Sequence, residues 1–301
     1  MNSFFTNKKV IVTGGAGFIG SHLVEKLVIY GAQVTVLDSL ITGNQENLAA
    51  VASAITFVEG DIRNKDLCHE LLRDCFAVFH LAAQVSVPES FDNPRLCYET
   101  NVTGTFNLLE AAVKHTVKRF VFSSSCAVYG DKSSPCSEST ECAPLSPYAY
   151  SKLMGEQLCQ HYAQLFHVPT VPLRYFNVFG PRQNPNGQYA GVIAKFTECI
   201  TKNEPVTIFG DGSQTRDFVP VSQIVQANLY AAQLPTSLCT GRPFNIATGD
   251  STSLLMLVEK LKKNFPQYSH PIRFAPARPG DIQHSQADCQ RFKELMRAME
   301  G

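Results

Sequence analysis

The stretch VIVTGGAGFIGSHLV at residues 10–24 decides how the chain folds. Its first three residues are apolar without alternation, which is typical of a strand that is buried on both faces of a sheet. Gly14, Gly17 and Gly20 follow at regular intervals, and apolar residues then recur at helical spacing. The stretch therefore predicts a central parallel strand that leads into a helix through a glycine-rich turn.

Each of the three glycines has its own physical purpose when such a turn binds a dinucleotide. Gly14 permits the tight turn, Gly17 lets the backbone approach a pyrophosphate, and Gly20 lets the helix pack closely on the strand. The N-terminus of the helix then stabilises the negative charge of the phosphates. A glycine triplet alone indicates only a turn. Its place between a buried strand and a helix predicts a dinucleotide site.

Two acidic residues at the ends of the next strands predict how the nucleotide is recognised. The second strand ends at Asp38, whose carboxylate can accept hydrogen bonds from both hydroxyls of an adenosine ribose. A 2′-phosphate would meet a like charge there, so Asp38 favours NAD over NADP as the cofactor. The third strand ends near Asp61, which is placed either to contact the adenine amino group or to be a solvated turn residue.

Strand-like and helical segments alternate along the chain, and this rhythm predicts an α/β fold with a doubly wound parallel sheet of the Rossmann type. The expected strands are 9–13, 33–37, 55–58, 77–81, 119–123, 170–175 and 243–247. The expected helices are 17–30, 67–73, 94–115, 147–166, 191–201 and 222–233.

The texture of the sequence changes after Gly180, where the loop-forming residues glycine, proline and asparagine become frequent. We therefore expect residues 1–176 to form an NAD-binding domain. Residues 177–301 are expected to form mainly a smaller, interleaved C-terminal lobe that binds the substrate. Residues 222–247 combine a helical pattern with a strand-like run, and we expect them to return to the first domain.

The composition limits the classes of partner. The 301 residues include 26 Lys and Arg and 26 Asp and Glu, so no net charge would draw the chain to nucleic acid or to a membrane surface. Its apolar runs are far shorter than the roughly 20 residues that a membrane helix needs, and its first residues lack a signal peptide pattern. The ten cysteines include no C-x-x-C pair. We expect a cytoplasmic protein with reduced cysteines and no metal site.

A candidate catalytic pair lies at the start of the helix expected at 147–166. Tyr148 and Lys152 are four residues apart and therefore share one face of this helix. A tyrosine with its ordinary pKa of about 10 is a poor base, and a neighbouring cation would favour its phenolate. Lys152 is placed to supply that cation. Taken alone, the pair is more typical of two surface neighbours.

A second segment supports a catalytic role for Tyr148 and Lys152. Ser123, Ser124 and Ser125 lie at the carboxyl end of a predicted strand, which faces the cofactor crevice in a doubly wound sheet. A serine hydroxyl there can hydrogen bond to an oxygen whose charge changes during hydride transfer. Each serine taken singly could instead cap the strand end. Together with Tyr148 and Lys152, they predict a dehydrogenase-type catalytic site.

The chain resembles the extended short-chain dehydrogenase/reductase family along nearly its whole length. Within that family it is most similar to UDP-sugar 4-epimerases, in particular those that act on UDP-N-acetylglucosamine and UDP-N-acetylgalactosamine. The motifs that carry the resemblance are GGAGFIGSH (14–22), HLAAQ (80–84), NVTGT (101–105), SSSCAVYG (123–130), SPYAYSK (146–152), LRYFNVFGPRQ (173–183), FGDGSQTRDF (209–218) and RPGD (278–281).

The resemblance implies a role for each matching residue. Tyr148 would be the base and acid, Lys152 would hold the nicotinamide ribose and tune Tyr148, and Ser125 would contact the reacting hydroxyl. Ser125 is preferred over its neighbours because it lies four residues before Tyr129, as the family's catalytic residue does. The residues expected to bind the cofactor are Gly14, Gly17, Phe18, Ile19, Gly20, Asp38, Gly43, Asp61, Ile62, Leu81, Ala82, Ala83, Gln84, Asn101, Ser123, Tyr148, Lys152 and Tyr175.

The resemblance also implies a site for a UDP-sugar. Asn177 would contact the sugar diphosphate, and Arg216 and Arg278 would contact the phosphates, for which the guanidinium fork is well suited. Phe209 and Asp281 would line the uridine site. The full set of residues expected to bind the substrate is Ser86, Ser125, Asn177, Phe209, Arg216, Arg278, Asp281 and Ser285.

The residues after Ser125 bear on the type of reaction. Dehydratases of this family usually carry an acidic residue directly after the corresponding hydroxyl residue, whereas this chain has Cys126 and Ala127. Neither is a carboxylic acid or base, so the resemblance favours epimerisation at C4 through a 4-keto sugar. Because NAD is regenerated in each such cycle, we expect it to be held tightly.

Ser285 aligns with a family position that limits the room at the sugar C2, and a small serine there favours an N-acetyl group. Serine could equally be a plain exposed residue at this point. Glu89 stands where relatives often have arginine, and Cys126 replaces a more usual serine, threonine or alanine. The sequence stops at Gly301, sooner than relatives that append a further helix, which we expect to loosen the smaller lobe.

Two alternatives stay open at this point. A UDP-glucuronate 4-epimerase or decarboxylase would need a cation near the sugar carboxylate, and residues 86–90 supply none. An NAD-binding sensor without catalysis would not need Ser125, Tyr148 and Lys152 together. The resemblance and the long helices expected at 94–115 and 147–166 also predict a homodimer that forms through an intermolecular helix bundle.

Overall fold

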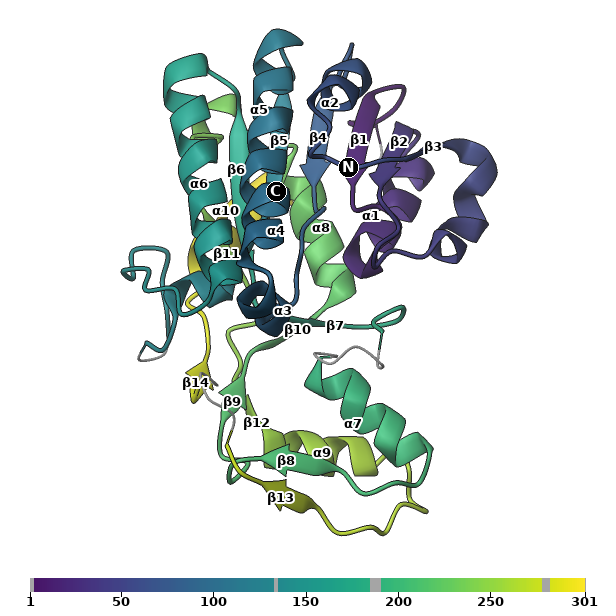
Figure 1. The fold of residues 1–301 in the computed structure, drawn as a ribbon, viewed down its shortest axis with the longest axis vertical. Helices are drawn as coiled ribbons and strands as arrows, with labels where there is room; N and C mark the ends of the chain where they lie inside the picture. Colours follow the sequence, from purple (N-terminus) through teal and green to yellow (C-terminus); the bar gives the residue numbers. More distant parts are fainter. Residues whose placement is uncertain (1–2, 133–134, 185–190, 278–281, 301) are drawn as a thin grey trace.

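The computed structural model describes residues 3–132, 135–184, 191–277 and 282–300 (Figure 1). Its centre is a seven-stranded sheet in the order β11-β6-β5-β4-β1-β2-β3, in which every strand pair is parallel. The expected α/β fold with a doubly wound sheet is therefore confirmed. The strands of this sheet are β1 (Lys9–Thr13), β2 (Gln33–Asp38), β3 (Ile55–Glu59), β4 (Ala77–His80), β5 (Arg119–Ser125), β6 (Thr170–Tyr175) and β11 (Phe244–Ile246).

The central strand β1 is apolar throughout because both faces of the sheet are covered. Val10 and Val12 pack into one core cluster, whereas Ile11 packs into the other. The first cluster lies under α1 (Phe18–Ile29), α8 (Val221–Ala231) and α10 (Gln290–Glu300). The second lies under α2 (Lys65–Leu71), α5 (Gly104–Lys114) and α6 (Pro147–Phe166).

The helix expected at 94–115 is continuous but is not α-helical throughout. It consists of α4 (Pro94–Tyr98), a π-helical segment at Glu99–Thr103 and α5. Such a segment holds one extra residue in the helical turn, and apolar periodicity does not reveal it. Between β2 and β3 runs a 3₁₀ segment (η1, Gln45–Ala54), and the short helix α3 (Val87–Asp92) precedes α4; neither was expected from the sequence.

The smaller lobe lies below the sheet in Figure 1 and has its own core. In it α7 (Val192–Thr201) and α9 (Leu254–Lys262) pack near the parallel pair β8 (Thr207–Phe209) and β13 (Arg273–Ala275). Ile208, Phe196, Leu257 and Val258 are buried between these elements. The chain crosses between the two parts more than once, so the smaller lobe is interleaved with the larger part.

Short strands join the two parts of the molecule. They are β7 (Asn177–Phe179) paired with β10 (Phe218–Pro220), and the three-stranded sheet of β12 (Thr252–Ser253), β9 (Thr215–Arg216) and β14 (His284–Ser285). Two further 3₁₀ turns are η3 (Cys126–Tyr129) and η4 (Thr236–Leu238). Within the described residues no disulfide joins the cysteines, and no helix has both the length and the apolar character needed to span a bilayer.

Candidate active site

The glycine turn lies where the order of the strands reverses, between β1 and β4. Gly14 has a φ of +69°, and a Cβ there would meet the main-chain nitrogen of Ala82 at 2.7 Å. The loops after β1 and β4 can therefore touch only because residue 14 is glycine. A Cβ at Gly20 would collide with the Gly14 carbonyl, so Gly20 is what allows α1 to begin so close to the strand.

The start of α1 is suited to bind a pyrophosphate. Its N-cap residue is Gly17, which has no side chain to cap the helix. A Cβ at Gly17 would meet only the Gly14 carbonyl, at 3.2 Å, so the space beyond it is open. The first main-chain amides of the helix, at Phe18 and Ile19, come directly after this position. The turn therefore fits the dinucleotide predicted from its sequence.

Asp38 lies at the carboxyl end of β2, beside the glycine turn, and is only 7% exposed. Its two carboxylate oxygens accept hydrogen bonds from the main-chain amides of Ala16 and Leu40, both at 2.9 Å. Gly43 also lies against it, since a Cβ at residue 43 would be 2.7 Å from the carboxylate. These contacts hold the carboxylate where a ribose hydroxyl can donate to its remaining lone pairs.

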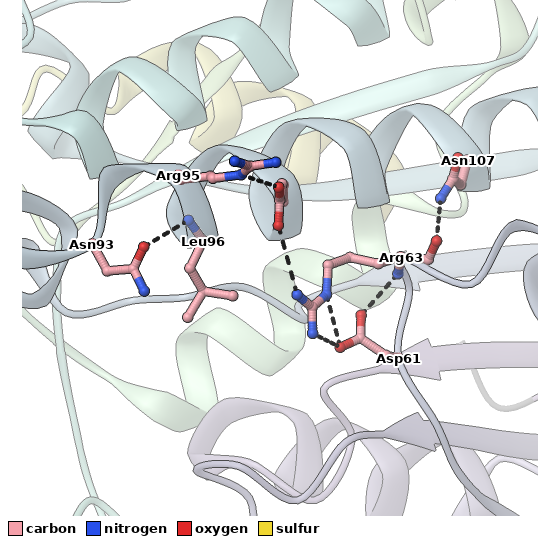
Figure 2. Close-up of polar contacts among 7 residues, drawn as sticks. Asp61, Arg63, Asn93, Arg95, Leu96 and Asn107 are labelled. Carbon is pink, nitrogen blue, oxygen red and sulfur yellow. Dashed lines mark hydrogen bonds and ion pairs between the residues drawn. The ribbon is translucent and has the colours of Figure 1, made fainter.

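Asp61 is part of a chain of charges at the end of β3 (Figure 2). Its carboxylate accepts hydrogen bonds from Nη2 and Nε of Arg63, at 2.7 and 3.0 Å, and from the Arg63 main-chain amide. Burial would raise the pKa of Asp61, but these hydrogen bonds and the charge of Arg63 outweigh it and lower that pKa. The Arg63 guanidinium also forms an ion pair with Glu99, and Glu99 forms a second ion pair with Arg95.

This arrangement adds Arg63 to the residues expected from the sequence. Asn107 donates to the Arg63 carbonyl at 3.1 Å, so α5 anchors the turn from the other side. Asp61 is thus an ionised acceptor held in one orientation. Its expected contact with the adenine amino group stays a prediction, and Arg63 is the residue that would fix its geometry.

A buried chain of hydrogen bonds joins β1, β4 and the π-helical segment. The Thr105 hydroxyl donates to the Asn101 carbonyl at 2.6 Å, so it must accept from Nε2–H of His80, at 2.8 Å. Nδ1 of His80 then accepts from the Thr13 hydroxyl, which itself accepts from the Ala82 amide at 3.2 Å. Burial lowers the pKa of His80 to about 3. His80 is therefore a neutral structural link.

Asn101 lies in the π-helical segment and is 2% exposed. Its Oδ1 accepts from the Gln84 amide at 2.8 Å, and its Nδ2 donates to the Gln84 carbonyl at 3.0 Å and to the Ser151 hydroxyl at 2.9 Å. Asn101 therefore braces the loop Leu81–Gln84 against α6. The contact between Glu89 and the Gln84 amide group shows that Glu89 faces the same loop.

The expected catalytic residues come together at the carboxyl end of β5. Lys152 is 3% exposed, and its Nζ donates to the Ser123 carbonyl at 2.8 Å. The hydroxyls of Tyr148 and Ser125 hydrogen bond to one another. The Ser125 hydroxyl also accepts from the Ala127 amide at 3.2 Å, which fixes the start of η3. Residues from β5 and α6 thus form one constellation at the same edge of the sheet as the glycine turn, with β4 between β5 and β1.

The expected effect of Lys152 on Tyr148 is corrected by the structure. The spacing predicted that the ammonium would favour the phenolate, but burial dominates and raises the pKa of Tyr148 to about 12, with the hydrogen bond from Ser125 opposing that rise. The Lys152 ammonium lies 5.9 Å from the centre of the Tyr148 ring, and burial lowers the pKa of Lys152 to about 8. The protein alone keeps Tyr148 protonated.

A buried ion pair joins the elements that carry Ser125, Tyr148 and Lys152. Glu156 lies one turn after Lys152 on α6 and accepts from Nη2 and Nε of Arg174, at 2.6 and 2.8 Å. The Ser124 hydroxyl also donates to Glu156, at 2.5 Å. The Tyr129 ring lies over the guanidinium, 4.7 Å from its carbon. The pair therefore ties α6, β5, β6 and η3 together, and the sequence offered no signal for it.

The residues expected to bind the sugar meet between β7, β9 and β14. Arg216 and Ser285 are register partners on β9 and β14. Asn177 Nδ2 lies 3.5 Å from the Ser285 hydroxyl, which also hydrogen bonds to the Cys126 thiol. The substrate gate inferred from the resemblance is therefore adjacent to the catalytic turn, and Cys126 faces it.

The other residues expected at the substrate site lie apart from this group or outside the described part of the chain. Phe209 ends β8 and its carbonyl accepts from Gln214. The Ser86 hydroxyl caps α3 by accepting from the Glu89 amide. Arg278 and Asp281 fall outside the described residues.

Two of the remaining residues named for the cofactor also lie near β5 and the end of β3. Tyr175 is buried; its hydroxyl donates to Asn228 at 2.9 Å and also hydrogen bonds to Ser123. Ile62 is buried against Gly104, where a Cβ would clash with its side chain. A cavity of about 410 Å³ lies elsewhere, between α8, β11 and α10, and no residue expected at the site lines it. Within the described residues no acidic, histidine and cysteine side chains cluster in a way that could hold a metal ion.

Residues 10–247 match the model of the family described as the NAD dependent epimerase/dehydratase family. The chain is 40% identical over 289 residues to a putative UDP-glucose 4-epimerase of Methanocaldococcus jannaschii, covering 95% of this chain and 92% of that protein. These matches confirm the family resemblance that the motifs carry.

Two solved structures are similar over nearly the whole chain. One is a UDP-glucose 4-epimerase with UDP-glucose from Thermotoga maritima, with a TM-score of 0.90, 39% identity and coverage of 96% of this chain and 92% of that chain. The other is a UDP-N-acetylglucosamine 4-epimerase from Methanobrevibacter ruminantium in complex with UDP-N-acetylmuramic acid. Its TM-score is 0.91 at 37% identity, with coverage of 96% of this chain and 92% of that chain.

Proposed function

Because the chain belongs to the NAD dependent epimerase/dehydratase family, we propose that it epimerises UDP-sugars at C4 and that its main substrates are UDP-N-acetylglucosamine and UDP-N-acetylgalactosamine. UDP-glucose and UDP-galactose are further substrates of the same site. The observation that carries the proposal is the meeting of Ser125, Tyr148 and Lys152 at the edge of the sheet that also holds the glycine turn. Relatives named as epimerases of both kinds of sugar support it.

The cofactor NAD, when bound, supplies the hydride acceptor and donor together with a positive charge in the crevice. Tyr148 can take the proton of the sugar C4 hydroxyl only as its phenolate, so it must have lost its own proton before this step; the neutral tyrosine that results later returns the proton. Burial raises the pKa of Tyr148 to about 12 in the protein alone, and the positive nicotinamide ring of bound NAD would favour its phenolate. Ser125 steadies the reacting oxygen by hydrogen bonding.

Lys152 has two duties in this proposal. Its ammonium is fixed by the Ser123 carbonyl and stands within reach of a ribose bound next to β5. Its ammonium also lies 5.9 Å from the centre of the Tyr148 ring, where a positive charge would favour the phenolate. Neither Cys126 nor Ala127 can serve as the carboxylic acid that removal of water would require, which supports epimerisation over dehydration.

Substrate recognition in this proposal falls to residues of the smaller lobe and its junction. Asn177 contacts the sugar diphosphate, Arg216 binds a phosphate, and Ser285 leaves room for the N-acetyl group at C2. The position of Ser285 beside Asn177 and Cys126 supports its role as a gate. Residues 1–176 with 222–247 form the NAD-binding domain, and residues 177–301 form mainly the substrate-binding lobe.

The protein is further proposed to be a homodimer that forms through α5 and α6. These neighbouring helices expose large apolar side chains that a monomer would leave in water. The exposed fractions are 40% for Phe106, 50% for Tyr150, 41% for Met154 and 53% for Phe166. Such a surface suits an intermolecular helix bundle with a twofold axis.

The test is an incubation of the purified protein with UDP-N-acetylglucosamine and no added cofactor. We expect the C4 epimer to accumulate to equilibrium, and NAD to be released when the protein is denatured and examined by mass spectrometry. Turnover of UDP-glucuronate alone would favour the acidic-sugar alternative. Released NAD without any turnover would favour a sensor and contradict the proposal.

A further inference from the structure

Asp217 lies at the junction of the two parts of the molecule and is fully buried. It stands between β9 and β10, directly after Arg216. Its carboxylate accepts three hydrogen bonds from one loop, from the Thr248 amide at 2.9 Å, the Thr248 hydroxyl at 2.7 Å and the Gly249 amide at 2.9 Å. Three donors compensate a buried carboxylate for the water that it has lost, so this contact is strong and directional.

The main chain of Asp217 is held by the two residues proposed to contact the sugar. Its amide donates to the Ser285 carbonyl at 2.8 Å. Its carbonyl accepts from the Asn177 amide and from the Asn177 side chain Nδ2, both at 3.1 Å. Asp217 is therefore bonded directly to Asn177 and Ser285 and covalently to Arg216, three residues that come from separate segments of the chain.

The connection has a consequence for the room around the sugar. Ser285 lies on β14, which pairs with β9 over only two residues, so the main-chain bonds of this pairing matter for its position. The Asp217 amide supplies one of them, and the carboxylate of Asp217 is anchored in turn by the loop at Thr248 and Gly249. A shift of about 1 Å at a positioning residue is enough to change recognition substantially.

We propose that Asp217 is a positioning residue for sugar specificity, which holds Ser285 and Asn177 at the spacing that admits an N-acetyl group. This inference rests on the proposed function and adds to it a residue that touches no substrate. When the anchor at Thr248 is weakened, the strand that carries Ser285 loses its fixed distance from Asn177. Affinity for the N-acetylated sugar then falls more than affinity for UDP-glucose, because the larger sugar needs all of the space beside Ser285.

The decisive variant is Asp217→Asn, which keeps the shape of the side chain but turns an acceptor into a donor facing Thr248 or Gly249. We measure calorimetric affinity for UDP-N-acetylglucosamine and UDP-glucose, together with turnover and bound NAD. Affinity for the N-acetyl sugar is expected to fall about tenfold more than affinity for UDP-glucose, with NAD content unchanged. The matched control is Asp250→Asn, an exposed residue of the same loop, which should leave the ratio of the two affinities unaltered.

Two variants at Thr248 test the same proposal with a smaller change, in case Asp217→Asn does not fold. Thr248→Val removes the hydroxyl bond to Asp217 together with the bond that the same hydroxyl accepts from the Asp250 amide, and Thr248→Ser restores both. We expect the valine variant to shift the ratio of affinities in the same direction by about threefold and the serine variant to return it. An equal loss on both sugars, or an unshifted ratio in the valine variant, would overturn the inference. Wild-type protein that binds both sugars but turns over neither would instead contradict the proposed function, while the ratio of affinities still decides the role of Asp217.

Discussion

The ammonium of Lys152 lies 2.8 Å from the main-chain carbonyl of Ser123, so a cation on α6 is bonded to the end of the strand that carries Ser125, the serine proposed to be catalytic. The same contact draws Lys152 into a site where it is 3% exposed. Burial there lowers its pKa to about 8. A lysine buried at this point lowers the stability of the fold, and the size of that loss depends on pH.

The first prediction concerns the pH dependence of stability. In the unfolded chain Lys152 keeps a pKa near 10.5, so between about pH 8 and 10.5 the unfolded state binds more protons than the native state. The contribution of Lys152 to the free energy of unfolding should then rise with pH across this window, by as much as about 3 kcal/mol. Urea denaturation of the wild type and Lys152→Met at several pH values measures this difference. Lys118→Met, at an exposed lysine, should keep the wild-type slope, and an identical slope in Lys152→Met would refute the assignment.

The second prediction tests the base. Tyr148→Phe should retain bound NAD but lose turnover by about 10² to 10⁴-fold, because only the hydroxyl that exchanges a proton is removed. Tyr150→Phe provides the control on the same helix, since Tyr150 is 50% exposed, and it should remain active. Steady-state rates and the absorbance of released NAD are the measurements. Substantial activity in Tyr148→Phe would assign the proton transfer to another group.

The third prediction tests the gate. Ser285→Tyr should suppress turnover of UDP-N-acetylglucosamine more than that of UDP-glucose, because the phenol fills the space next to Asn177 and Cys126. Ser285→Ala, which leaves the space open, should retain both activities. The ratio of kcat/KM for the two sugars is the quantity to compare. Equal losses on both sugars in Ser285→Tyr would remove the gate argument.

The fourth prediction concerns the buried pair of Glu156 and Arg174, whose side chains are each 5% exposed. Arg174→Met leaves the Glu156 carboxylate buried without its cation and should lower the free energy of unfolding by about 3 to 5 kcal/mol. The double variant Glu156→Leu with Arg174→Met removes both charges and should regain most of that loss. Urea titrations of the wild type, Arg174→Met, Glu156→Leu and the double variant form the cycle. Strictly additive losses would show that the two side chains do not depend on one another.

The fifth prediction concerns assembly. Light scattering should give the mass of a dimer, and Met154→Glu with Phe166→Glu on α6 should convert it to a monomer, because buried carboxylates at the interface would lack partners. Met256→Glu places one carboxylate on α9, where Met256 is 54% exposed, and should leave the dimer intact. A monomeric wild-type protein would end the dimer hypothesis.

The features that could be predicted from the sequence are those in which neighbouring residues determine the outcome. The strand, glycine turn and helix of residues 10–24 follow from apolar spacing and from the conformational freedom of Gly14. The extent of α6 and the shared face of Tyr148 and Lys152 follow from helical periodicity. Periodicity could not show that the helix at 94–115 contains a π-helical segment. Asn101 lies in this segment and makes a tertiary contact with Ser151, which apolar spacing does not report.

The tertiary structure alone determines which residues far apart in the sequence come into contact. It also determines how burial changes the pKa values of their side chains. Nothing near Asp217 in the sequence indicates that it joins Asn177 to Ser285, or that Glu156 meets Arg174. The pKa of Tyr148 shows why. Spacing placed Lys152 on the same helix face, but removal from water is a property of the whole fold. In the folded protein that loss of hydration outweighs the hydrogen bond from Ser125 and raises the pKa of Tyr148.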